Sequence, residues 1–276
     1  MADLEKAFLI LTILGYAASS VALIVGTVFG SVRWQRLGMT LVWGSLLLNT
    51  ATIAVRWQNV GHGPYISRYE VLLSNTWVAT ALYLFFSRVW PVVTIVGGAV
   101  MPIILLGLGA VYLSPSEIVY LSPSQRSAWL IVHIAFAKLT SGALLVATGL
   151  SIAYLLKQRP AYGRCSWQDR LPAPEKCDDL SYKMTACAFV FSSIMIISGS
   201  IWGNQLWGRY WGWDPLETWS LVVWLVYGLY LHLRITYRFK GEMSAYFIIG
   251  AFLFTLVSFF VLPYILDTIH NAYMVN

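Results

Sequence analysis

The chain consists of long apolar runs separated by short polar segments. A helix of roughly 20 apolar residues crosses a bilayer core of about 30 Å, and eight runs of this kind are present. They lie at about 7–29, 37–55, 69–87, 90–113, 126–156, 180–203, 216–238 and 244–267. The first run is too long for the core of a signal peptide and is not followed by a small-residue cleavage site, so we keep it as a span. The pattern predicts an all-α fold, a polytopic membrane helical bundle of about eight transmembrane helices, with a single domain over residues 1–276.

Composition excludes most other classes of protein. Of the 276 residues, 58% are hydrophobic and only 11% are charged, whereas a soluble domain has about 25% charged residues. This excludes a soluble globular enzyme and an intrinsically disordered chain. The net charge is +6, but the cations are scattered between apolar runs without a basic stripe, so we expect no nucleic-acid binding. The three cysteines form no CxxC pair and so indicate neither a zinc site nor a disulfide framework; they are Cys165, Cys177 and Cys187.

The distribution of Lys and Arg predicts the orientation. Cytoplasmic loops carry an excess of these residues, and here one set of loops holds twelve of them and the opposite set five. This bias places both termini on the outer side, together with the loops at 57–68, 114–125 and 204–215. The segment at about 157–179 is then the largest cytoplasmic loop, and we interpret it as a solvated connector.

Five of the 13 tryptophans lie within residues 202–219. One interpretation is an aromatic belt at the headgroup level. Belts spread their rings over many helix ends, however, whereas these tryptophans share one loop with interleaved glycines that let a ligand approach the backbone. Tryptophan faces offer a flat aromatic ligand a large apolar surface, so a binding platform is favoured. Asp214 followed by Pro215 and Glu217 has the pattern of a helix N-cap, and we expect it to begin the seventh span.

The string WGRYWGWDPLETWS at residues 207–220 resembles the tryptophan-rich "WWD" signature of haem-handling proteins. Its WDPxETWS ending is most similar to the CcsA/ResC (also called CcsB) members, which belong to the system II cytochrome c synthases. The resemblance implies that the chain works with haem b, a ResB-type membrane partner and apocytochrome c. It also implies a bacterial inner membrane with the site on the periplasmic side, or a thylakoid membrane.

The chain has four histidines, and two of them are candidates for one iron. His133 lies about seven residues into the fifth span, roughly 10 Å below its outer end, and His270 follows the eighth span by about three residues. Both could reach a planar ligand on the Trp loop, and imidazoles suit iron as an axial pair. A hydrogen-bonded structural role is the alternative for each. In the resemblance, the WLIVH run ending at His133 corresponds to the first external haem ligand and the IHNAY run holding His270 to the second.

For the other two histidines, His232 and His62, we expect different roles. His232 lies about 16 residues into the seventh span, roughly 24 Å from the outer surface, so it cannot serve the same iron as His133. The resemblance makes it a ligand of a second, intramembrane haem, with the other ligand from the ResB-type partner; a hydrogen-bonded bundle residue is the alternative. His62 lies in the GHGPYISRYE segment, which resembles a family loop, and we interpret it as loop architecture.

The remaining expectations concern the haem site as a whole. Haem carries two propionates, and Arg209 and Arg56 are candidates to pair with them; interface snorkelling is the alternative for Arg56. Lys138 lies about 140° around the helix from His133 and receives no role. The predicted cofactor-binding set is completed by Trp202, Trp207, Trp211, Trp213 and Asp214.

The function implied by the resemblance is covalent attachment of haem to CxxCH motifs of apocytochrome c on the outer side. The reacting thiols come from the substrate, so no catalytic acid, base or nucleophile of this chain is needed, and the protein's task is positioning. Three alternatives stay open at this point: a structural scaffold that uses its tryptophans only as anchors, a haem exporter or carrier without synthase activity, and a b-type electron-transfer subunit. The last is disfavoured because such proteins usually carry two histidines on one helix.

Overall fold

The computed structural model describes residues 2–118, 121–159 and 167–272. This part of the chain forms eight α-helices joined by turns and short 3-10 helices, and it contains no strand. The helices are α1 (Ala2–Phe29), α2 (Val32–Val60), α3 (Arg68–Val89), α4 (Gly97–Leu113), α5 (Ala128–Gln158), α6 (Pro174–Trp207), α7 (Pro215–Thr236) and α8 (Glu242–Phe260). The predicted all-α membrane bundle is therefore confirmed.

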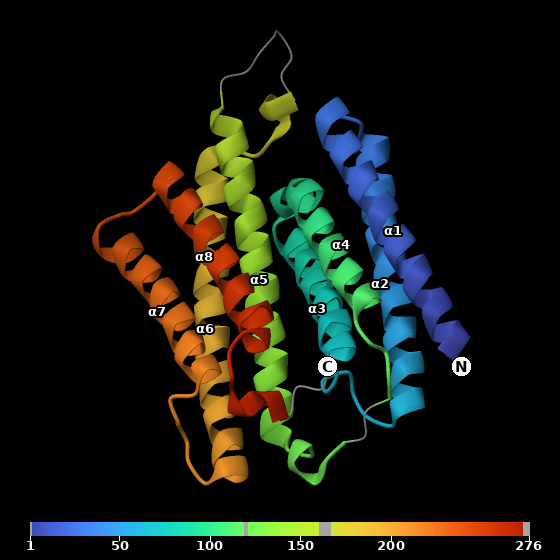
Figure 1. The fold of residues 1–276 in the computed structure, drawn as a ribbon. Helices are drawn as coiled ribbons and strands as arrows, with labels where there is room; N and C mark the ends of the chain where they lie inside the picture. Colours follow the sequence, from blue (N-terminus) through green and yellow to red (C-terminus); the bar gives the residue numbers. More distant parts are fainter. Residues whose placement is uncertain (1, 119–120, 160–166, 273–276) are drawn as a thin grey trace.

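Helix α5 joins two groups of helices, with α1–α4 on one side and α6–α8 on the other (Figure 1). It contacts α3 and α4 in the first group and α6 and α8 in the second. The residues between Gly142 and Ser151 are buried almost without interruption. A Cβ atom at Gly142 would lie 3.2 Å from Cα of Ala79 in α3, so this close approach of two helix backbones requires a residue without a side chain.

Seven of the helical segments in the described residues are long and apolar enough to cross a membrane, and the chain is an integral membrane protein. The third expected span forms α3, which has 22 residues but does not meet this standard of hydropathy. Its polar side chains face neighbouring helices: Asn49 of α2 donates a hydrogen bond to Thr76 of α3 at 3.2 Å. A helix that buries polar groups against protein needs less apolar character than one that faces lipid. The exact number of transmembrane helices stays a prediction.

The loops assigned to the outer side gather at one end of the bundle. The described residues of the α2–α3, α4–α5 and α6–α7 connections and of the segment after α8 lie at the lower end in Figure 1, and those of the α5–α6 and α7–α8 connections at the upper end. This grouping agrees with an even number of crossings. The assignment of the lower end to the outer side of a membrane stays a prediction from the distribution of Lys and Arg.

Several helix boundaries differ from the expected spans, among them the start of α6 and the end of α8. Helix α6 begins at Pro174, within the predicted cytoplasmic loop, and a short 3-10 helix at Trp167–Arg170 precedes it. Pro160, Arg164 and Cys165 of that loop lie outside the described residues. Helix α8 ends at Phe260 instead of about 267, because the chain turns into a 3-10 helix at Leu262–Tyr264 that contains Pro263, and proline does not continue an α-helix.

Candidate functional site

A cavity of about 280 Å³ lies between α3, α5, α6, the start of α7 and the segment that follows α8. It opens at the end of the bundle that carries the Trp segment 202–219, and we call it the histidine cavity. Its lining includes both histidines expected to share an iron and three of the tryptophans of the segment, namely His133, His270, Trp202, Trp207 and Trp211. Residues more than 130 positions apart in the sequence thus meet at one site.

His133 is held by the backbone of α6. Its Nδ1 lies 2.8 Å from the carbonyl oxygen of Met195, and a carbonyl can only accept, so Nδ1 carries the proton. In the neutral ring this leaves Nε2 with a free lone pair, the state that a metal ligand requires. A Cβ atom at Gly199 would lie only 2.6 Å from Nδ1 of His133. The missing side chain at Gly199 is what lets the imidazole lie this close to α6.

His270 is held by a carboxylate. Its Nδ1 lies 2.9 Å from Oδ2 of Asp214, and its ring meets the ring of Trp207 edge-on with 5.2 Å between centroids. A carboxylate that accepts from one ring nitrogen fixes the tautomer and the orientation of the other, as is common for histidines that bind metals. Both histidines of the cavity therefore have one nitrogen anchored by protein and the other available.

Asp214 caps α7, as expected, and it also anchors the segment after α8. It caps α7 by accepting from the amide of Leu216 at 3.1 Å, in a capping box with Glu217, which confirms the predicted N-cap. It also accepts from the amide of Ile269 at 2.9 Å and from the hydroxyl of Thr268 at 2.5 Å. Burial raises the pKa of this carboxyl, but the hydrogen bonds to its ionised form outweigh burial and hold the pKa below its ordinary value.

The tryptophans of the segment divide into two groups. Trp202 is 5% exposed and packs at 6.0 Å, centroid to centroid, on Trp207, and both line the cavity with Trp211. Trp213, which was expected to bind the cofactor, is 70% exposed and outside the lining. Trp219 packs against Phe254 of α8 instead.

Glu217 ties the Trp segment to the first turn of α7. Its carboxylate accepts from the amides of Gly212 at 2.7 Å and Asp214 at 3.2 Å. Between these two residues Trp213 has a φ of 56°, in the left-handed region, which is unfavourable for a bulky side chain. The hydrogen bonds on either side hold this conformation, and the exposed Trp213 ring lies outside the cavity lining, edge-on to Trp211 with 5.9 Å between centroids.

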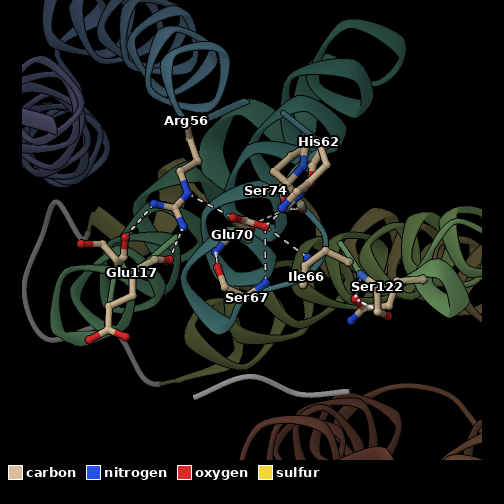
Figure 2. A network of polar contacts seen from close by, with 12 residues as sticks. Arg56, His62, Ile66, Ser67, Glu70, Ser74, Glu117 and Ser122 are labelled. Carbon is tan, nitrogen blue, oxygen red and sulfur yellow. Dashed lines mark hydrogen bonds and ion pairs between the residues drawn. The ribbon is translucent and has the colours of Figure 1, made fainter. Parts of the chain in front are cut away.

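The two arginines expected to face haem do not line the cavity. The guanidinium of Arg56 is 2% exposed and contacts Oε1 of Glu70 at 3.0 Å and the carbonyl oxygens of Ser116 and Glu117 at 2.7 and 2.8 Å. Figure 2 shows this network, in which Arg56 joins α2 to α3 and to the chain after α4. The expectation for Arg56 is corrected: its donors are engaged within the protein. Arg209 is exposed and its guanidinium lies against Gly212.

Sequence reasoning missed Lys138, which lines the same cavity as His133. The angle between Lys138 and His133 around the helix axis suggested that their side chains have different surroundings. That angle places only the Cβ atoms, whereas a lysine carries its ammonium far from Cβ on a flexible stem. The ammonium of Lys138 lies 3.1 Å from the carbonyl oxygen of Pro64 and 2.6 Å from the hydroxyl oxygen of Ser74.

The other two histidines lie outside the histidine cavity. His232 is exposed on α7, near the end of the helix remote from the Trp segment, with Nδ1 3.5 Å from the hydroxyl of Thr236. This contact leaves open the alternative of a hydrogen-bonded bundle residue. His62 is buried, and its Nδ1 lies 3.8 Å from Oε2 of Glu70 (Figure 2), an arrangement consistent with loop architecture.

Comparisons with known proteins connect this site to a family. A family model described as "Cytochrome C assembly protein" matches residues 65–270. A cytochrome c biogenesis protein CcsA from Synechococcus sp. (strain CC9902) is 34% identical, over 88% of this chain and 90% of the relative. A CcsA from Chlamydomonas reinhardtii is 34% identical, over 78% of this chain and 62% of the relative.

A solved structure supports the fold. The cytochrome c haem lyase CcmF superposes with a TM-score of 0.71 over 93% of this chain, at 20% sequence identity, and this chain spans 46% of that protein's length. The family match includes α3 to α8, the Trp segment and both histidines of the cavity. The chain therefore belongs to the cytochrome c assembly family, among its CcsA/ResC members, and takes part in cytochrome c biogenesis.

Proposed function

We propose that the protein carries haem b to the outer face of the membrane and presents it for covalent attachment to CxxCH motifs of apocytochrome c, together with a ResB-type membrane partner. One observation carries this proposal: His133 and His270 line the same cavity, and each has its Nδ1 anchored. Family membership supports the reaction class, because the family handles haem during cytochrome c assembly.

The residues of the cavity fit a haem. Two neutral imidazoles with free Nε2 atoms are suitable axial ligands for iron. The lining is mostly apolar and aromatic, as expected for a site that holds a porphyrin ring. Gly199 leaves room beside His133 where a Cβ atom would meet the imidazole. The donor set and the apolar, aromatic character of the lining therefore agree on the same ligand.

The chain's own residues act by positioning. Met195 and Asp214 hold the two imidazoles in one tautomer and one orientation before the ligand arrives, so this ordering cost is not incurred on binding. Haem supplies the vinyl groups to which the substrate thiols add. The buried Trp202 and the partly buried Trp207 line one side of the cavity and would shield a bound ring from water on that side.

The position of His232 supports a second haem site shared with a partner. Its ring is exposed near the end of α7 remote from the Trp segment, and among the described residues no second histidine lies beside it. An iron bound to His232 with two protein ligands therefore needs a ligand from another chain, the role we propose for the ResB-type protein. Haem then moves from this inner site to the histidine cavity.

Co-expression tests the proposed function. We expect the protein, a ResB-type partner and an apocytochrome with a CxxCH motif to produce haem that stays with the cytochrome on a denaturing gel. Omission of either membrane protein is expected to abolish this product. Haem bound by the purified protein without any covalent product in the full combination would identify an exporter or carrier and contradict the synthase role.

The second site is tested by His232→Ala. We expect the variant, co-purified with the ResB-type partner, to contain less haem at both sites, because haem reaches the histidine cavity through the inner site. Added imidazole is expected to restore loading, since it replaces the missing ligand. Leu229→Ala, at another exposed position of α7, is the control. Haem content equal to that of the control would contradict the role of His232.

A further inference from the structure

Lys138 is a buried cation whose direct partners are uncharged. The residue is 8% exposed, and its ammonium contacts the carbonyl oxygen of Pro64 and the hydroxyl of Ser74. Within residues 2–118, 121–159 and 167–272, no carboxylate forms an ion pair with it. Two acceptors leave one of the three ammonium hydrogens without a protein partner.

Burial of such a charged group costs free energy unless an anion lies nearby to compensate its charge. A charge removed from water loses solvation that neutral acceptors replace only in part, and ionisable side chains within membrane spans usually serve function. Glu70 acts on Lys138 only through space, because its two carboxylate oxygens are already bound by Arg56 and by the amides of Ile66 and Ser67 (Figure 2). The charge of Lys138 is therefore available to a negatively charged ligand of the cavity.

The position of Lys138 suits a ligand bound by His133. Both residues belong to α5 and line the histidine cavity, and five residues along a helix correspond to a rise of about 7.5 Å. This separation is of the order of the distance from the centre of a porphyrin to its periphery. Pro64 and Ser74 hold the ammonium against α3 and the loop before it, so its position does not depend on the ligand.

We propose that the ammonium of Lys138 binds a carboxylate of haem in the histidine cavity and thereby sets which edge of the porphyrin faces α3. The inference rests on the proposed function, since it names the group that orients the same ligand. The propionates occupy one edge of haem, so an anchor at this wall turns the opposite edge away from α3. Lys138 is a positioning residue in this scheme and takes no part in bond formation.

Haem and its dimethyl ester distinguish this role from a structural one, because the ester lacks the negative charges and keeps the ring and the iron. We expect the purified protein to bind haem about tenfold more tightly than the ester, as is typical for a charge-assisted hydrogen bond. Lys138→Met is expected to bind haem about tenfold more weakly than the wild-type protein and to bind the ester equally well. Ser74→Ala removes one neutral partner and keeps the charge, so it should retain the preference for haem.

Three results would overturn the inference, and a fourth would contradict the proposed function instead. Equal affinity of the wild-type protein for haem and the ester would overturn the inference, even if Lys138→Met did not fold. An equal loss of both ligands in Lys138→Met, or a loss of preference in Ser74→Ala as large as in Lys138→Met, would also overturn it, because packing would then be the cause. Failure of the wild-type protein to bind either porphyrin would instead contradict the proposed function.

Discussion

Replacing His133 or His270 by alanine is expected to remove most of the haem from the histidine cavity and nearly all covalent cytochrome product. Loss of a group that only orients a metal ligand lowers metal affinity by about 10- to 100-fold, and loss of the ligand itself should cost at least as much. The measurement is the haem absorbance per protein after purification, together with the denaturing gel. Added imidazole is expected to restore part of the absorbance, because it can occupy the space left by the side chain.

A matched histidine provides the control for this experiment. His62 is buried at the same end of the bundle but does not line the cavity, so His62→Gln should keep its haem. Full haem and full activity in both His133→Ala and His270→Ala would refute the assignment of the two ligands. Loss of haem in His62→Gln as large as in the two alanine variants would indicate a general effect on folding and would equally contradict the assignment.

The second large effect is expected for Asp214→Asn. Asparagine caps helices as well as aspartate does, so α7 should begin at the same residue. It has one acceptor oxygen, however, whereas Asp214 uses both oxygens for Leu216, Thr268, Ile269 and His270. The amide also lacks the charge that stabilises the protonated Nδ1 of His270. We expect haem affinity to fall about 10- to 100-fold, with little change in thermal stability.

The pH dependence of the same contact follows from the lowered pKa of Asp214. Its pKa is lower in the folded protein than in an unfolded chain, so the stabilisation is complete above the ordinary aspartate pKa of about 3.9. It is lost as the pH falls through the folded value. Any release of haem from the wild-type protein above about pH 5 should therefore not result from protonation of Asp214. Ser67→Ala, which removes the side-chain cap of α3 at the same end of the bundle, is the control for a general loss of stability, and haem loss in it equal to that in Asp214→Asn would contradict a specific role of Asp214.

The tryptophan segment illustrates where local patterns suffice. Asp214, Pro215 and Glu217 predicted the start of α7 correctly, because a cap depends on residues within one turn. The same pattern did not predict that Asp214 contacts His270, because the two residues lie 56 positions apart in the sequence. Trp213 was grouped with its neighbours because it shares their motif, but in the structure it is exposed and outside the cavity lining.

The positions of the buried cations, in contrast, could not be predicted from local sequence patterns. Arg56 and Lys138 are both isolated in sequence, and the outer location of Arg56 made it the better candidate for haem. In the structure Arg56 is engaged by Glu70 and by the chain after α4, whereas Lys138 lines the cavity. Long charged side chains are placed by partners from other helices, and no spacing along one helix encodes these partners.

The sequence alone determined that this protein is a bundle of membrane helices with a tryptophan-rich segment, because apolar run length and helix caps are local properties. Its motifs also indicated the family and the two histidines. The tertiary structure decided that His133 and His270 line one cavity, that Met195 and Asp214 anchor them, and that Lys138 rather than Arg56 lines it. These contacts join α3, α5, α6 and the segment after α8, and such distant pairs form only when the helices pack.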